Sequence, residues 1–163
     1  MENNGSSYFN SPSLGKITFE EVIRGLASFV KKEPDRAYKL IVGTDSSGRV
    51  SHQADFVTAV IIHRVGQGAI YFWQTKAVVT KMSLKERIFQ EAFFSLETAQ
   101  NFLTRLGKEN GLISSLEIHV DVGQLGPTRD IIHEVVGMIR GNGFAVKIKP
   151  DSYGASKVAD RHT

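Results

Sequence analysis

Three segments rich in Val, Ile, Phe, Tyr, Trp and Thr follow one another along the chain, and they constrain the fold more than any other feature. They cover about residues 38–45, 54–64 and 69–78, and the gaps between them hold only SSGRVSHQ and GQG. Turn residues bound each segment, as is typical of β-strands. Because such short connections cannot carry a crossover, the pattern predicts an antiparallel meander of three strands.

The remainder of the chain alternates helical and strand-like segments. We expect helices at about 83–106 and 127–141, strands at 116–123 and 144–150, and a last helix from 154. A further helix precedes the meander in ITFEEVIRGLASFVKKEP, where Thr18 and Glu21 have the spacing of a capping box. Alternation of this kind predicts parallel crossovers that cover both faces of a sheet. The predicted fold class is α/β, with a mixed five-stranded sheet in the order βββαβαβα, flanking helices and an extra N-terminal helix.

Length and composition predict one domain with an N-terminal arm. The chain has 163 residues and no cysteine, which excludes disulfides and thiolate metal sites. Residues 1–16 are rich in Asn, Ser, Gly and Pro and are expected to form a flexible arm, followed by a single domain over 17–163. The start of the chain lacks the pattern of a signal peptide, and the longest apolar run, VTAVII, is far below the ~20 residues of a membrane span. A cytoplasmic protein without a membrane partner is therefore expected.

Two acids stand at the ends of predicted strands. Asp45 closes the first strand in KLIVGTDSS, and Asp121 closes the fourth in LEIHVDVG. If these strands are parallel neighbours, their carboxyl ends meet at one edge of the sheet, where sites form in open α/β folds. On the fourth strand, alternation places Glu117, His119 and Asp121 on one face. The alternative for Asp45 is a turn former before Ser-Ser-Gly.

The long helix adds a third acid. At 100° per residue, Glu91 falls at the edge of the apolar stripe, whereas Glu86 and Glu97 fall on nearly the opposite face and are expected to meet water. Glu91 is therefore the helical carboxylate that is expected to point at the sheet. An ion pair with Lys85 or Arg87 is the alternative for Glu91.

These elements and acids resemble the ribonuclease-H-like superfamily. The strings GTDSS, KMSLKERIFQEAF, HVDVGQLGPTRDIIHEVVGMIRGNGF and IKPDSYGASKVADRHT are similar to the YkuK family of predicted nucleases, over about residues 17–163. The resemblance implies that Asp45, Glu91, Asp121 and Asp160 bind Mg²⁺ or Mn²⁺, ions that prefer oxygen ligands. Asp151 competes with Asp160 for the fourth place. Asp160 is favoured because an acid on a helix can be aimed back at the sheet.

The function that the resemblance implies is a nuclease that hydrolyses phosphodiester bonds in nucleic acid with bound metal ions, the choice between RNA, DNA and hybrid remaining open. The alternative is a non-catalytic module that binds nucleic acid or protein. A zinc site that includes His119 and His162 would need three or four converging ligands and is not favoured. The net charge of +3 supports a polyanionic partner only mildly. Basic residues near the expected site either follow a nucleic-acid backbone or belong to a surface of mixed sign: Lys76, Lys81, Lys85, Arg87, Arg129, Lys157 and Arg161.

Overall fold

A mixed sheet forms the centre of the molecule. The computed structural model of the chain describes residues 8–50, 53–79, 81–106 and 115–163. Strands β3 (Tyr38–Val50), β4 (Gln53–Arg64) and β5 (Ala69–Val78) pair antiparallel, which is the predicted meander. Strands β6 (Ser115–His119) and β7 (Ala145–Lys147) add on the other side of β3, both in parallel. The sheet order is β2-β1-β5-β4-β3-β6-β7, so the described sheet has seven strands rather than the five expected.

The two additional strands come from the segment that the sequence analysis assigned to a flexible arm. Strands β1 (Tyr8–Ser11) and β2 (Gly15–Thr18) pair antiparallel, and β1 also pairs with β5. Phe9 is the anchor of this hairpin, because it is buried and its ring lies against those of Phe19 and Phe102. The expected arm over 1–16 therefore differs from the structure at residues 8–16, and residues 1–7 lie outside the described part.

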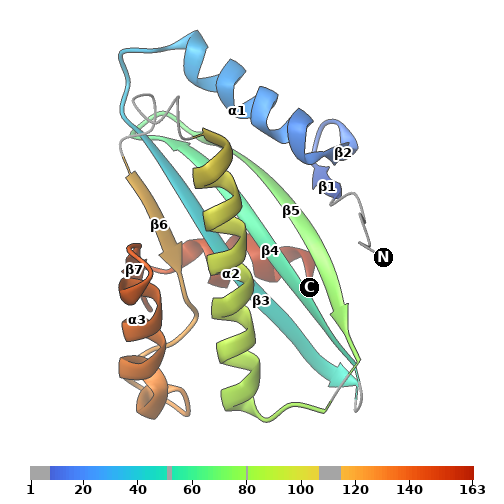
Figure 1. Cartoon of the computed structure of the whole chain (residues 1–163), viewed down its shortest axis with the longest axis vertical. Helices are drawn as coiled ribbons and strands as arrows, with labels where there is room; N and C mark the ends of the chain where they lie inside the picture. The colour runs from blue at the N-terminus through green and yellow to red at the C-terminus, as the bar shows by residue number, and fades with distance from the viewer. Residues whose placement is uncertain (1–7, 51–52, 80, 107–114) are drawn as a thin grey trace.

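Helices cover one face of the sheet. Helix α1 (Phe19–Lys32) begins at the predicted capping box, in which Glu21 N donates to Thr18 Oγ1 and Thr18 N donates to Glu21 Oε2. Helix α2 (Leu84–Leu106) crosses in front of β3 and β4, and α3 (Ile132–Gly141), preceded by the short η2 (Arg129–Ile131), lies beside it (Figure 1). Their apolar sides close one core with Leu40, Val42 and Val60 of the sheet. Within the described residues, no helix is both long and apolar enough to cross a bilayer.

The C-terminal segment covers the opposite face of the sheet. It forms η3 (Gly154–Ala159), a π-helical stretch, and then η4 (Asp160–His162), and it runs behind the strands in Figure 1. The segment lies directly on the backbone of β3: a Cβ atom at Gly43 would stand 2.6 Å from the amide nitrogen of Ala155. The predicted last helix therefore exists as a π-helical stretch followed by a short 3₁₀ turn, and glycine at position 43 is what allows it to approach β3.

Candidate functional site

Parallel pairing places Asp45 and Asp121 at the same end of the sheet. The last pair in the register of β3 and β6 is Gly43 with His119, and each acid follows two residues later on its own chain segment. Strand β6 ends at His119, whereas β3 continues to Val50. Asp121 therefore lies two residues beyond the end of β6, whereas the predicted strand 116–123 included it. At Asp45, β3 still pairs with β4 on one side, but its pairing with β6 on the other side has ended. Within the described residues, no strand therefore separates Asp45 from Asp121.

The Asp45 carboxyl sits among like charges. It is half-buried, and its pKa is raised to about 6, first because burial disfavours the charged form and then because of the negative charges of Asp160 and Asp121. Its carboxyl is also within hydrogen-bonding reach of the Asp160 side chain, while the backbone amide of Ser46 acts in the opposite direction. The structure thus brings Asp45, Asp121 and Asp160 to one place.

Glu91 approaches the same place from α2. Its side chain is buried, with 3% of the residue exposed, which agrees with the predicted inward direction. Glu86 is exposed and bonds the N-terminus of its own helix, and Glu97 forms an ion pair with Lys76. Burial is the main reason that the pKa of Glu91 is raised to about 8. The hydrogen bond from Ser46 opposes this shift, and the charges of Asp45 and Asp121 add to it.

Ser46 and Arg87 hold Glu91 in position. Ser46 Oγ donates to Glu91 Oε1 at 2.5 Å, and it accepts from Arg87 Nε at 3.2 Å and from Nη2 at 3.0 Å. Arg87 Nη2 also donates to the carbonyl oxygen of Ser46 at 3.0 Å. The alternative ion pair of Glu91 with Arg87 is thus replaced by a bridge through Ser46. Sequence reasoning missed Ser46, because Ser-Ser-Gly was interpreted only as a turn, although alternation along the strand does point Ser46 toward the helix.

Asp121 forms an ion pair with Lys149. Lys149 Nζ lies 3.2 Å from Asp121 Oδ1, an ion pair in which the lysine side chain is 50% exposed. The geometry is not that of a hydrogen bond, since Oδ1 is buried and has no hydrogen-bond partner within the described residues. Because the Lys149 side chain is half-exposed, water screens this pair in part and limits its contribution to stability. Lys149 can therefore leave Asp121 at low cost when another cation or a ligand arrives.

The two candidates for the fourth acid lie in different surroundings. Asp160 begins η4, is exposed, and acts on Asp45 as described above. Asp151 is also exposed, in the turn where its amide donates to Ile148 O at 2.8 Å. Asp151 is not among the charges that raise the pKa of Asp45 or of Glu91. The geometry therefore groups Asp160, and not Asp151, with the other three acids.

The histidines named for zinc hold the C-terminal segment instead. His119 is buried, and its Nδ1 accepts from Gly154 N at 3.0 Å. Because an amide can only donate, the ring proton must be on Nε2, which lies 2.8 Å from Glu117 Oε1. His162 stacks on Trp73 with ring centroids 3.7 Å apart and lies 3.3 Å from the Tyr71 hydroxyl. In the ranges that the structure describes, no three His, Cys, Asp or Glu residues are spaced to hold a metal ion as they stand.

The basic residues near the site do not form a uniform positive surface. Lys76 pairs with Glu97 and Lys85 with Glu134, while Arg87 is committed to Ser46. The other four are exposed: Lys81, Arg129, Lys157 and Arg161. The surface beside the carboxylates therefore carries both signs, with cations remaining on the C-terminal segment and around η2.

Comparison with known proteins gives the family. The model of the family described as "Ribonuclease H-like" matches residues 21–163. The chain is also 36% identical to the uncharacterized protein YkuK of Bacillus subtilis (strain 168), in a match that covers 97% of this chain and 98% of that protein. The match includes the central strands, α2 and the C-terminal segment, which together carry the four acids. With the mixed sheet and its order of elements, these matches show that the chain belongs to the ribonuclease H-like family and is a relative of YkuK within it.

Proposed function

We propose that the chain is a metal-dependent nuclease that hydrolyses phosphodiester bonds in nucleic acid, with Asp45, Glu91, Asp121 and Asp160 as ligands of Mg²⁺ or Mn²⁺. Membership of the ribonuclease H-like family supports a role connected with nucleic acid. The proposal of catalysis goes further and rests on the carboxylates themselves.

The environment of Asp45 carries the proposal. Its carboxyl is half-buried and lies near those of Asp160 and Asp121, and burial first and then these negative charges raise its pKa to about 6. Holding like charges together in a half-buried place costs stability unless a cation lies between them. The main core packs on the α2 face of β3, whereas Asp45 lies on the face of the C-terminal segment, beside the small cluster of Val57, Ala59 and Ala159. A bound divalent cation would turn this cost into an interaction that stabilises the folded chain.

The available donor atoms fit a hard cation. Two carboxylate oxygens, Glu91 Oε2 and Asp121 Oδ1, are buried without a hydrogen-bond partner within the described residues. All four proposed ligands are carboxylates, which suit Mg²⁺ and Mn²⁺ better than softer metals. Since the acids are not spaced to hold an ion as they stand, binding would require them to draw together, and the exposed Asp160 has room to move.

Each residue would have a distinct task. A bound Mg²⁺ or Mn²⁺ ion would activate water and stabilise the charge that develops on the phosphodiester. Ser46 and Arg87 would keep Glu91 in place as the rigid ligand, because they join it to the backbone of β3. Lys149 balances the charge of Asp121 in the absence of metal, and it would then be able to turn to a substrate phosphate.

A non-catalytic binding module is the second candidate. The observation that favours it is the absence, among the described residues, of three ligands already spaced for a metal ion. In such a module the acids would be a structural cluster, and nucleic acid would be held by the exposed cations. Binding would then be equally strong in EDTA and in Mn²⁺, which distinguishes it from the nuclease.

The test is a panel of labelled single-stranded RNA, single-stranded DNA, both duplexes and the hybrid, incubated with Mg²⁺ or Mn²⁺. The nuclease should cleave at least one of them, and Asp45→Asn should lose about 100-fold or more of that activity. Asp35→Asn is the control, because Asp35 is exposed in the loop after α1. Cleavage that is the same in wild type and Asp45→Asn would assign the activity to a contaminant. Binding in EDTA without cleavage would favour the module.

A further inference from the structure

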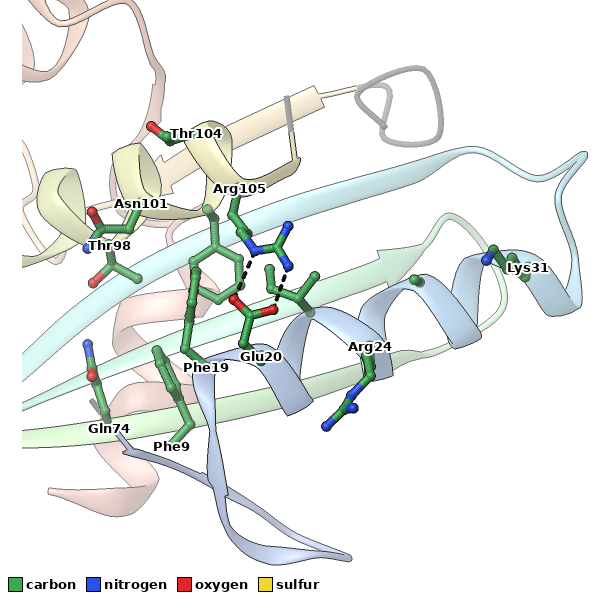
Figure 2. A pocket seen from close by; sticks show the side chains of 13 residues that line it. Phe9, Phe19, Glu20, Arg24, Lys31, Gln74, Thr98, Asn101, Thr104 and Arg105 are labelled. Carbon is green, nitrogen blue, oxygen red and sulfur yellow. Dashed lines mark hydrogen bonds and ion pairs between the residues drawn. The ribbon is translucent and has the colours of Figure 1, made fainter. Parts of the chain in front are cut away.

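A large cavity of the described residues lies away from the carboxylates. It has a volume of about 960 Å³ and lies between α1 and the C-terminal half of α2, over β1 and β5 (Figure 2). Its lining on α1 extends from Phe19 to Lys31, which is about 18 Å along a helix axis. Its lining on α2 begins at Thr98, about 10 Å beyond Glu91 along the same helix. We call it the α1–α2 groove, and its size is that of a site for a small molecule.

One part of the α1–α2 groove is aromatic and has polar atoms beside it. Phe9, Phe19 and Phe102 contact one another there, with the rings of Phe19 and Phe102 edge to face at a centroid distance of 4.9 Å. Gln74 and Thr98 border the same part and are almost completely buried. The hydroxyl of Thr98 forms no hydrogen bond within the described residues. Although the Thr98 side chain is mostly covered, its hydroxyl oxygen still reaches the groove, so a ligand there can bond it in place of water.

The rim of the α1–α2 groove is cationic. Arg105 forms a forked pair with Glu20, through Nε–Oε1 at 2.9 Å and Nη2–Oε2 at 2.5 Å, and Figure 2 shows this pair over the aromatic rings. Glu20 is thereby committed to Arg105. Arg24 and Lys31 also line the groove, and neither forms a hydrogen bond or ion pair in the part of the chain that the structure describes. Two cations thus remain available for an anion on the α1 side.

These features together fit one class of ligand. We infer that the α1–α2 groove binds a nucleoside phosphate, with the base against Phe19, the partly exposed ring of the three, and within reach of Thr98, and the phosphate paired with Arg24 and Lys31. An aromatic wall suits the face of any base, and an arginine suits a phosphate through its planar fork of donors. A purely apolar ligand would leave both cations unpaired, and inorganic phosphate alone would make no contact with the partly exposed ring of Phe19. The chemistry is the same for a free mononucleotide and for the terminal nucleotide of a strand.

The test is calorimetric titration in EDTA with the four nucleoside 5′-monophosphates, the corresponding nucleosides and inorganic phosphate as probes. At least one monophosphate should bind with a dissociation constant below about 1 mM, and it should bind about tenfold more tightly than its nucleoside. Arg24→Gln and Thr98→Val should each weaken that binding about tenfold. Arg140→Gln is the control for charge, because Arg140 is exposed on α3 and does not line the groove.

Two further measurements separate the possibilities. A 5′-phosphorylated oligonucleotide that competes for the site and is sensitive to Arg24→Gln would identify a strand end as the source of the nucleotide, and failure to compete would identify the free mononucleotide. Asp45→Asn should bind the monophosphate as wild type does. The outcome for the α1–α2 groove is therefore independent of whether the nuclease proposal is correct. Absence of binding by all four monophosphates at several millimolar would overturn the inference. Binding that Arg24→Gln and Thr98→Val leave unchanged would overturn it as well.

Discussion

Ser46 Oγ donates a hydrogen bond of 2.5 Å to Glu91 Oε1, and this bond joins β3 to α2 one residue from Asp45. Arg87, which lies on the same helix as Glu91, donates to the same hydroxyl and so fixes the serine that holds the carboxylate. Asp45 and Ser46 are consecutive on a strand, so they point to opposite faces of the sheet. Asp45 lies beside Asp160 on one face of the sheet, and Ser46 bonds Glu91 on the other face. Two consecutive residues of β3 therefore connect the acids of both faces.

Replacement of this serine should destabilise the fold. Ser46→Ala leaves Glu91 buried without its donor and removes a side-chain acceptor from Arg87, and we expect the free energy of unfolding to fall by about 1–3 kcal/mol. Urea denaturation at pH 9, where Glu91 is ionised, measures the change. Ser47→Ala, at the neighbouring and partly exposed position, should change it by less than about 0.5 kcal/mol. Equal losses in the two variants would contradict the role given to Ser46.

The raised pKa of Glu91 predicts how stability depends on pH without metal. The folded chain holds this proton up to pH about 8, whereas the unfolded chain releases it near 4.5. Between these values the folded state binds more protons, so stability falls as pH rises from about 4.5 to 8. Asp45 acts in the same direction up to pH about 6.

Glu91→Gln tests this pH dependence directly. The variant should be more stable than wild type at pH 9 in EDTA, by an amount on the order of a few kcal/mol, because it has no charge to bury. At pH 4 the two proteins should be nearly equal, since Glu91 is protonated in both folded and unfolded chains. Urea denaturation at the two pH values measures the difference. A variant that is less stable than wild type at pH 9 would show that ionised Glu91 stabilises the metal-free fold.

The close approach of the C-terminal segment to β3 predicts opposite effects at two glycines. A Cβ at Gly43 would stand 2.6 Å from Ala155 N, whereas a Cβ at Gly137 on α3 meets nothing within 4 Å. Gly43→Ala should therefore lower stability by about 1–3 kcal/mol, and Gly137→Ala should raise it by up to about 1 kcal/mol. Thermal denaturation of both variants checks the prediction. If Gly43→Ala is tolerated as well as Gly137→Ala, the segment does not lie on β3 as described.

Asp45 and Asp121 could be placed together from the sequence because strands, short gaps and crossovers leave few topologies. The direction of Glu91 could be predicted for a similar reason, since helical periodicity fixes the buried stripe of α2. The hairpin of β1 and β2 could not, because each strand has four residues and a polar composition. Its stability depends on Phe9 reaching Phe102, which is distant in sequence. Contacts of this kind leave no local pattern.

The supports of the site were also beyond sequence reasoning. The bond from Gly154 N to His119 exists only because η3 folds back onto β3, and the stack of His162 on Trp73 joins the end of the chain to β5. The α1–α2 groove combines residues of four elements and has no motif of its own. Such features depend on how surfaces meet, whereas Asp45, Glu91 and Asp121 could be found because each stands on, or just after, an element whose own pattern is visible in the sequence.

Titration of Mn²⁺ into the metal-free protein tests the central claim most directly. Wild type should bind the ion, and Asp160→Asn should bind it about tenfold or more weakly, because Asp160 faces Asp45 across the site. Asp151→Asn is the matched control and should bind as wild type does, since Asp151 lies in the turn near Ile148. Isothermal calorimetry of the three proteins at one pH gives the comparison. Binding that Asp151→Asn abolishes and Asp160→Asn preserves, or no binding by wild type, would contradict a metal site built from these four acids.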